Sequence, residues 1–206
     1  MTEHYFTARP ASADDLRPLA VRLADTELQL VSARGVFSPD HVDQGTQVLL
    51  REVPDPPADG DLLDLGCGWG PVALTLALRS PRARVWGVDV NERSLDLLRR
   101  NAATAGADNV RAVLADAVPD DVRFATIWSN PPIRVGKQVL HEMLLHWLPR
   151  LLPGASAYLV VQRNLGSDSL QRWLAAELDD SFAVSRESTS KSFRILKVRK
   201  ASPLPQ

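Results

Sequence analysis

From Asp61 onward, short apolar runs alternate with amphipathic stretches, and this alternation constrains the fold more than any other feature of the sequence. Repeated strand and helix segments indicate a parallel sheet that is covered by helices on both faces. The predicted strands are 61–65, 84–88, 110–114, 124–129 and 155–162, and the predicted helices are 71–79, 92–105, 137–152 and 169–178. Two further runs, 182–186 and 193–198, lie close enough along the chain to form an antiparallel pair. We therefore expect an α/β protein with a doubly wound sheet.

The first part of the chain is less clearly patterned. Residues 14–25 are predicted as a short helix and 27–33 as an alternating strand. Ser38 is a candidate N-cap for a helix over 40–53, with Pro39 at its first position. The Pro- and Asp-rich segment that follows breaks the chain. We accordingly expect an N-terminal extension over 1–53, a core over 54–200 and a disordered tail over 201–206.

Composition places the chain among soluble proteins of one core. Its 206 residues suffice for a single α/β core with a small appendage. The single cysteine, Cys67, excludes a disulfide framework and suits a reducing cytoplasm. No apolar run is long enough to span a bilayer, and the N-terminus lacks the basic and apolar regions of a signal peptide. We expect a cytoplasmic monomer or homodimer that binds no membrane.

The segment Ser129-Asn130-Pro131-Pro132 ends a predicted apolar strand with a stiff loop. Two consecutive prolines donate no backbone hydrogen bonds and fix their own φ angles, so the strand has to stop there. An asparagine held at such a point presents a poised amide. Its side-chain oxygen and the Pro131 carbonyl are both placed to accept hydrogen bonds from an amino group.

A glycine-rich turn, Asp64-Leu65-Gly66-Cys67-Gly68-Trp69-Gly70, lies between a predicted strand and a helix opened by Pro71. Doubly wound sheets bind ligands at this position, beyond the carboxyl ends of their strands. The spacing G-x-G-x-G is tighter than the dinucleotide fingerprint, and the Lys-Ser/Thr pair of nucleoside triphosphate sites is missing. Cys67 is interpreted as a packed side chain, since no base neighbours it, and Trp69 either covers a cofactor or fills the core.

Three acids stand at the ends of three successive predicted strands. Asp64 begins the glycine turn, Asp89 is placed to accept hydrogen bonds from ribose hydroxyls, and Asp116 to meet an adenine amine. Any one of them alone has an even chance of being a helix or turn cap. Several carboxylates together suit a ligand with positive charge, which favours S-adenosylmethionine over NAD.

These segments, together with Gly35 to Thr46 and Asn130 to Lys137, resemble the methyltransferase small domain family of class I S-adenosylmethionine-dependent methyltransferases. That family includes ribosomal RNA guanine-N2 methyltransferases acting on small-subunit RNA and single-domain archaeal relatives. The resemblance covers about residues 28–200. It implies a Rossmann-like, seven-stranded sheet, mostly parallel with an antiparallel last strand, and S-adenosylmethionine as the cofactor.

The resemblance also implies roles for individual residues. The cofactor-binding residues would be Asp43, Thr46, Asp64, Gly66, Gly68, Asp89 and Asp116, with 43–46 over the methionine end. The catalytic residues would be Asn130 and Pro131, which hold the amine that is methylated. A conjugated exocyclic amine is a poor nucleophile, because its lone pair is delocalised. Two acceptors that grip its hydrogens would favour a tetrahedral nitrogen and aim the lone pair at the methyl group.

The substrate side departs from the related adenine and glutamine enzymes at Ile133, where they carry an aromatic residue that stacks on the substrate. Phe37 is a candidate replacement. Arg134 and Lys137 are candidate contacts to the phosphates of RNA, and the basic terminal strands either extend that surface or are the solvated side of an edge strand, at even odds. His141 and His146 show no metal-ligand pattern, so no metal is predicted.

The leading hypothesis is therefore an RNA N-methyltransferase, specific for guanine N2 in ribosomal RNA or the small ribosomal subunit. Two alternatives remain open. One is methylation of a protein glutamine amide or a small-molecule amine through the same loop. The other is a cofactor-binding module without turnover, against which the intact Asn130 and glycine turn argue. The bacterial guanine-N2 enzymes carry an additional N-terminal domain, whereas this chain has only a short extension, so target selection is expected to differ.

Overall fold

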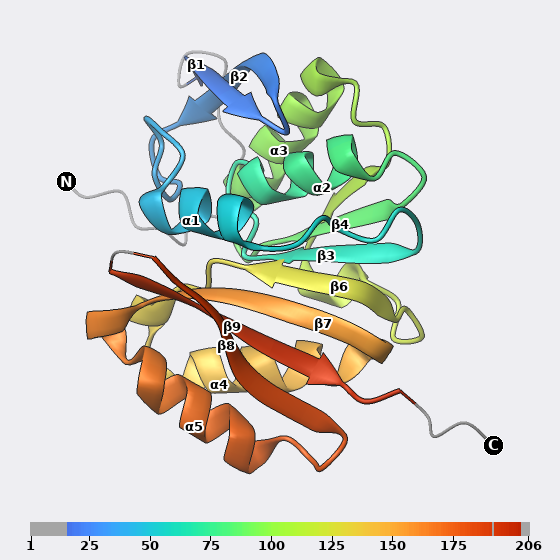
Figure 1. The fold of residues 1–206 in the computed structure, drawn as a ribbon. Coiled ribbons are helices and arrows are strands. Elements are labelled where there is room, and N and C mark those ends of the chain that lie inside the picture. The colour runs from blue at the N-terminus through green and yellow to red at the C-terminus, as the bar shows by residue number, and fades with distance from the viewer. Residues whose placement is uncertain (1–15, 191, 203–206) are drawn as a thin grey trace.

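The computed structural model describes residues 16–190 and 192–202, and the side chain of Arg134 lies outside that description. Seven strands form one sheet in the order β5-β4-β3-β6-β7-β9-β8 (Figure 1). The strands are β3 (Asp61–Leu65), β4 (Arg84–Val88), β5 (Val110–Val113), β6 (Phe124–Ser129), β7 (Leu151–Gln162), β8 (Phe182–Ser190) and β9 (Phe193–Lys200). The strands β3 to β7 run parallel, and β9 inserts antiparallel between β7 and β8. This confirms the predicted seven-stranded, Rossmann-like sheet with an antiparallel last strand.

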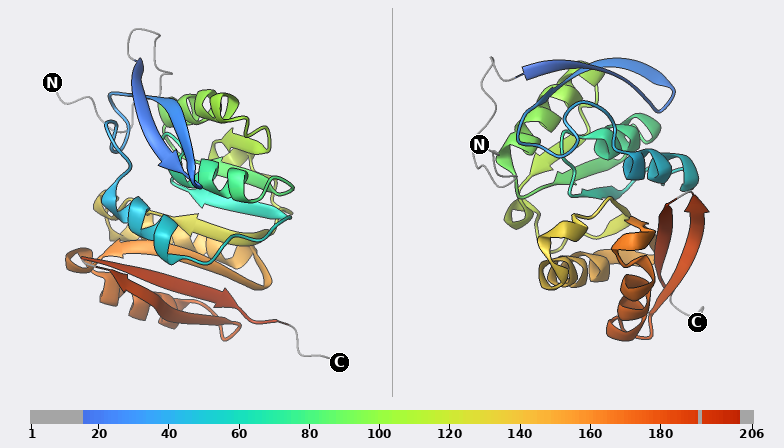
Figure 2. Two further views of the ribbon diagram at one scale, coloured as in Figure 1. Left: turned by 45° about the horizontal axis from the view of Figure 1, so that its top comes forward. Right: turned by 90° about the vertical axis from the view of Figure 1, so that its left-hand side faces the viewer.

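Helices cover both faces of the sheet (Figures 1 and 2). The first face carries α1 (Gln44–Glu52), α2 (Pro71–Arg79) and α3 (Glu92–Ala105), and the other carries α4 (Lys137–Trp147) and α5 (Ser167–Glu177). Each face has its own apolar core. Val72 and Leu98 belong to the first core, and Leu144 and Leu174 belong to the second. In the described part of the chain, no helix is long and apolar enough to cross a membrane.

The helix predicted over 14–25 is wrong. Residues 16–23 form β1 (Leu16–Leu23), which pairs antiparallel with β2 (Thr26–Ala33) in a separate two-stranded sheet. Leu19, Val21 and Leu23 are buried while the residues between them are exposed, which is the period of a strand. The two-residue turn at Ala24 and Asp25 has positive φ angles, as a tight hairpin requires.

Two predicted helix ends also differ from the structure. The first helix begins at Gln44 with Asp43 as its N-cap, whereas the predicted cap, Ser38, lies in a preceding loop at a φ of 47°. The helix predicted to extend to 152 ends at Trp147 and passes through a short 3₁₀ turn to β7. Pro149 explains this second difference, because a proline lacks the N–H that would continue the helix. The predicted tail falls largely on 203–206, outside the described residues.

Candidate active site

Four of the predicted site residues lie at the carboxyl ends of four neighbouring parallel strands. Asp116 follows β5, Asp89 follows β4, Asp64 is the penultimate residue of β3, and Asn130 follows β6. In the sheet these strands stand in that same order. Adjacent strands are about 4.8 Å apart, so the row spans roughly 14 Å. The row is long enough for an elongated ligand that meets carboxyl groups along most of its length.

Asp64 is buried, with 1% of its surface exposed. Its Oδ2 accepts a hydrogen bond from the Ala73 amide at 2.8 Å. Burial raises the pKa of the Asp64 carboxyl to about 8, and the nearby charge of Asp89 adds to that rise. A cationic group that enters the cavity beside Asp64 would favour the ionised carboxylate, so the site is suited to a ligand with positive charge.

The glycine turn leaves open space next to Asp64. Gly66 has a φ of +79° and Gly68 a φ of +54°, conformations that L side chains rarely adopt. A Cβ on Gly68 would meet no atom within 4 Å, and one on Gly66 would meet Pro132 Cδ at 3.9 Å. The turn thus keeps its backbone bare toward the cavity, as close approach by a ligand requires.

Asp89 lies at the carboxyl ends of the parallel strands, which we call the ligand edge of the sheet. It also holds the glycine turn in place. Its Oδ2 accepts from the Gly68 amide and its Oδ1 from the Asn91 amide, each at 2.9 Å. Burial raises the pKa of the Asp89 carboxyl, although these hydrogen bonds oppose the rise. The interpretation of Asp89 as a turn cap is therefore correct in part. Asp116, in contrast, is exposed on a 3₁₀ turn after β5 and does not line the cavity beside Asp64.

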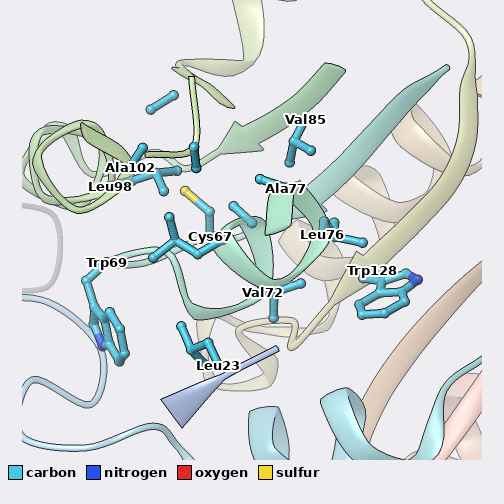
Figure 3. Close-up of a cluster of buried hydrophobic side chains, with 14 of the residues drawn as sticks. Leu23, Cys67, Trp69, Val72, Leu76, Ala77, Val85, Leu98, Ala102 and Trp128 are labelled. Atoms are coloured by element: carbon cyan, nitrogen blue, oxygen red, sulfur yellow. The ribbon is translucent and has the colours of Figure 1, made fainter. Parts of the chain in front are cut away.

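Cys67 and Trp69 belong to the apolar core under the turn (Figure 3). The thiol is buried, and burial raises its pKa well above the usual value, so it is not a nucleophile. Trp69 is 2% exposed, and its Nε1 donates to the Ser38 carbonyl at 3.1 Å. The indole fills the core and at the same time fixes the loop that precedes α1 against the glycine turn.

Asn130 has the geometry that a hydrogen-bond acceptor for an amine requires. Its Nδ2 donates to Asp43 Oδ2 at 2.8 Å and to Thr46 Oγ1 at 3.0 Å. The nitrogen end of the amide is therefore held by the start of α1, which leaves Oδ1 as the acceptor for a substrate. The Pro131 carbonyl already accepts from the Ile133 amide at 2.8 Å, so its second lone pair is the one that a substrate can use.

These groups meet in one small cavity of about 30 Å³. Its lining includes seven of the predicted residues: Phe37, Asp43, Thr46, Asp64, Gly66, Gly68 and Asn130. A space of that size holds little more than a water molecule or a methyl group. A ligand larger than this has to extend beyond the cavity. A larger hollow of about 450 Å³ lies between the β1–β2 hairpin, α1 and α2. Neither the glycine turn nor the acids at the strand ends, Asp64, Asp89 and Asp116, line it.

The predicted substrate contacts differ in how well the structure supports them. Phe37 is 49% exposed at the cavity, and Lys137 is exposed at the start of α4. Ile133 is only half-buried and packs against the second core. The prediction for Arg134 concerns a side chain outside the described part of the chain.

The basic terminal strands are oriented mainly away from the site. Because β9 is antiparallel to β7, Phe193 lies opposite Gln162 at the ligand edge, and Arg199 lies opposite Ser156 toward the other end. Lys197 pairs with Glu187 at 3.0 Å, and Lys200 donates to backbone carbonyls at the start of β7. These contacts favour a structural role for the far ends of the strands.

Two residues at the ligand edge were not predicted from the sequence. Phe193 is half-buried beside α1, where a Cβ on Gly45 would lie 3.0 Å from its Cε1 and 3.4 Å from Asn130 Nδ2. Arg163 is exposed directly after β7. The polar run that ends the fifth strand was the only local signal for Arg163. Nothing local signals Phe193, which depends on how the last two strands close the sheet.

His141 and His146 are both packed on aromatic rings. His141 stacks on Trp173 with ring centroids 3.4 Å apart, and His146 meets Trp147 edge to face at 5.0 Å. Among the described residues, no group of three or more His, Cys, Asp or Glu side chains is arranged to hold a metal ion.

Comparison with known proteins supplies the family. The methyltransferase small domain matches residues 27–197. The uncharacterized protein YbxB of Bacillus subtilis is 32% identical over 203 residues, which cover 97% of this chain and all of that protein. Ribosomal RNA small subunit methyltransferase C of Pseudomonas aeruginosa is 37% identical over 160 residues, which cover 73% of this chain and 48% of that protein.

A solved structure agrees with these sequence relatives. The Thermus thermophilus 16S rRNA N2 G1207 methyltransferase (RsmC), in complex with AdoMet and guanosine, superposes with a TM-score of 0.77 at 26% identity. The superposition covers 93% of this chain and 52% of that chain, so this chain spans about half the length of the RsmC proteins that it matches. The chain thus belongs to the methyltransferase small domain family and is an S-adenosylmethionine-dependent methyltransferase.

Proposed function

We propose that this methyltransferase acts on an exocyclic amine, and specifically on guanine N2 of ribosomal RNA. The observation that carries the proposal is the amide of Asn130. Its nitrogen is held by Asp43 and Thr46, so Oδ1 is left as an acceptor, and Asn130 lines the cavity. The carbonyl of the next residue, Pro131, is the second acceptor in this proposal. An amino group with two hydrogens matches this pair of acceptors.

The residues at the site would then perform two tasks: they would hold the cofactor and bind the amine. S-adenosylmethionine, when bound, supplies an electrophilic methyl group. Asp64, Asp89 and the glycine turn would hold the cofactor, and the buried carboxyl of Asp64 would suit its positive charge. Asn130 Oδ1 and the Pro131 carbonyl bind the two amine hydrogens, which draws the nitrogen toward a tetrahedral geometry and orients its lone pair. One of these hydrogens leaves to solvent as a proton after the transfer, and the site needs no strong base.

Three observations favour guanine in RNA as the substrate. The superposed Thermus protein is named for N2 methylation of a guanine and holds guanosine. In addition, Lys137 and Arg163 are exposed cations that follow β6 and β7, on the edge where the backbone around an extruded base would lie. The aliphatic side chain of Ile133 fits a base that is held mainly by edge hydrogen bonds and apolar packing.

The test is incubation with radiolabelled S-adenosylmethionine and, in separate reactions, small ribosomal subunits, protein-free RNA and a cell protein extract. We expect label in RNA, and N2-methylguanosine after digestion to nucleosides. The Asn130→Ala variant should retain cofactor affinity and lose transfer by about 10²-fold or more, as when one preorganised group is removed from a catalytic site.

The other outcomes distinguish the alternatives. Label in the protein extract alone would replace RNA by a glutamine amide or a related group. Label in none of the reactions, despite measurable cofactor binding, would contradict the RNA proposal and leave a small-molecule amine or a module without turnover. Equal loss of binding and transfer in Asn130→Ala would contradict the role given to Asn130.

A further inference from the structure

The nitrogen of the Asn130 amide is fully used by two acceptors at the start of α1. A primary amide has two N–H bonds, and here one points to Asp43 Oδ2 at 2.8 Å and the other to Thr46 Oγ1 at 3.0 Å. The contact with Asp43 also indicates which end of the amide is which. Asp43 Oδ2 already accepts from two backbone amides, so the atom of Asn130 that faces it is the nitrogen, which donates.

Asp43 is itself fixed by the start of the helix. It is the N-cap of α1, and the same Oδ2 accepts from the amides of Gly45, at 2.8 Å, and Thr46, at 3.2 Å. Thr46 is 4% exposed, so its hydroxyl has little room to move. The first turn of α1 therefore presents a rigid pair of acceptors to a residue 87 positions further along the chain.

Glycine at position 45 makes this close approach possible. A Cβ there would lie 2.9 Å from Asp43 Oδ2 and 3.4 Å from Asn130 Nδ2. The first distance is shorter than Cβ atoms tolerate, so any larger residue has to displace the Asp43 carboxylate, which bonds the amide. The start of α1 thus holds the Asn130 amide with two acceptors, Asp43 and Thr46, and Gly45 leaves the space that this contact needs.

We propose that Asp43 and Thr46 are positioning residues that lock the Asn130 amide with its oxygen toward the substrate. This inference rests on the proposed function, in which that oxygen binds the amine. The two orientations of an asparagine amide have nearly the same shape and exchange nitrogen for oxygen. In the reversed orientation, the NH2 group would face the hydrogens of the substrate amine, and donor would meet donor. The acceptors on α1 disfavour that orientation because Asp43 would then face the amide oxygen.

This role differs from the one expected from the family resemblance, in which both residues serve the cofactor. Loss of a cofactor contact would raise the dissociation constant for S-adenosylmethionine. Loss of the lock would instead lower kcat, because a fraction of the bound complexes would present the wrong end of the amide. The two roles are therefore separable in steady-state kinetics combined with cofactor titration.

Thr46→Val tests the lock with the smallest change, because valine has the shape of threonine without the hydroxyl. We expect kcat to fall about tenfold, the cofactor dissociation constant to stay within about twofold, and Thr46→Ser to restore most of kcat. Thr75→Val is the matched control. Thr75 is also a buried threonine on a helix, and its hydroxyl donates to the Pro71 carbonyl. After Thr75→Val that carbonyl still has a hydrogen-bond partner in the backbone of α2. Unchanged kcat in Thr46→Val, or a raised cofactor dissociation constant with normal kcat, would overturn the proposal.

A second measurement reads the lock without turnover. In a ¹⁵N-labelled protein, the two side-chain amide protons of Asn130 are identified by their loss in Asn130→Ala. We expect slow exchange with solvent for both in the wild type. One should shift and exchange faster in Thr46→Val, and both should do so in Asp43→Ser, which retains a capping side chain too short to reach Asn130. Unaltered signals in both variants would refute the lock. Full transfer by Asn130→Ala, in an enzyme whose wild-type lock is intact, would instead contradict the proposed function.

Discussion

Asp64 is a buried acid at the site that we propose for the cofactor. Its carboxyl group is buried near the end of β3. It accepts one hydrogen bond, from the Ala73 amide, and lies near Asp89. In the sequence these features were visible only as an acid before a glycine turn. The structure adds the burial that raises the pKa of the carboxyl, and this burial lowers the stability of the cofactor-free protein by a measurable amount.

Replacing Asp64 with asparagine should make the cofactor-free protein more stable at neutral pH. The pKa of Asp64 is raised from 3.8 to about 8 on folding. Between these values the folded state keeps a proton that the unfolded state has lost, so the free energy of unfolding falls as pH rises, by up to about 1.4 kcal/mol per pH unit. The asparagine in the Asp64→Asn variant does not titrate. The difference in melting temperature between variant and wild type should therefore grow from about pH 5 to about pH 8, and a constant difference would contradict the buried, protonated state.

Gly45→Ala should lower activity although it favours the helix. Alanine in a helix interior is about 1 kcal/mol more favourable than glycine. At this position, however, the added Cβ would lie 2.9 Å from Asp43 Oδ2 and 3.0 Å from Phe193 Cε1. We expect kcat to fall about tenfold with the cofactor dissociation constant nearly unchanged. A variant with normal kcat and a higher melting temperature would show that the helix start shifts without disturbing Asn130.

At the scale of elements, the exact ends of several helices and strands could be predicted from the sequence. The helices Pro71–Arg79 and Glu92–Ala105 and the strands Asp61–Leu65 and Arg84–Val88 agree with the sequence because their ends carry local signals, such as Pro71 and Gly106. The strand predicted over 27–33 agrees with β2, whereas β1 was predicted as a helix because its apolar residues also fit a helical face. The contact between Asn130 and α1 was missed because it joins distant segments, and no local pattern encodes such a pairing.

The β1–β2 hairpin packs apolar side chains into the first core, and one buried polar side chain, Asn101, also bonds its backbone to that core. Asn101 on α3 accepts from the Val31 amide at 2.8 Å and donates to the carbonyls of Val31 and Trp69, each at 2.9 Å. The Asn101 side chain therefore bonds both the N–H and the C=O of Val31, as the backbone of a neighbouring strand would. Its bond to Trp69 also connects the hairpin to the glycine turn.

Asn101→Ala should loosen the hairpin as a unit. The change leaves three backbone groups without their partner, and each unsatisfied buried group costs about 1–3 kcal/mol. We expect a loss of several degrees in melting temperature and faster hydrogen exchange of the Val31 amide, with slow exchange retained in β3. Exchange that accelerates equally in β3 and β2 would indicate global destabilisation and contradict a local attachment.

At the scale of the whole molecule, exposed cations occur at both ends of the seven-stranded sheet. Lys137 and Arg163 lie at the ligand edge, whereas Arg199 lies opposite Ser156 on β7. The part of β9 from Phe193 to Arg199 extends about 20 Å at the rise of a strand. Charge effects decay over about 8–10 Å at physiological ionic strength, so Arg199 is too distant to act on a nucleotide held at Asn130.

Charge reversal at the two ends should therefore affect RNA binding differently. Lys137→Glu and Arg163→Glu are expected to weaken binding about tenfold each and to reduce the salt dependence, since each lost phosphate contact removes roughly 0.7–0.9 from the slope of log K against log salt. Arg199→Glu makes the same change in net charge at an exposed position far from the site and serves as the matched control. We expect it to leave the slope within error of the wild type when fluorescence anisotropy is measured over a salt series. An equal effect of all three reversals would mean that RNA is held by net charge alone, and no effect of the first two would place the RNA on another face.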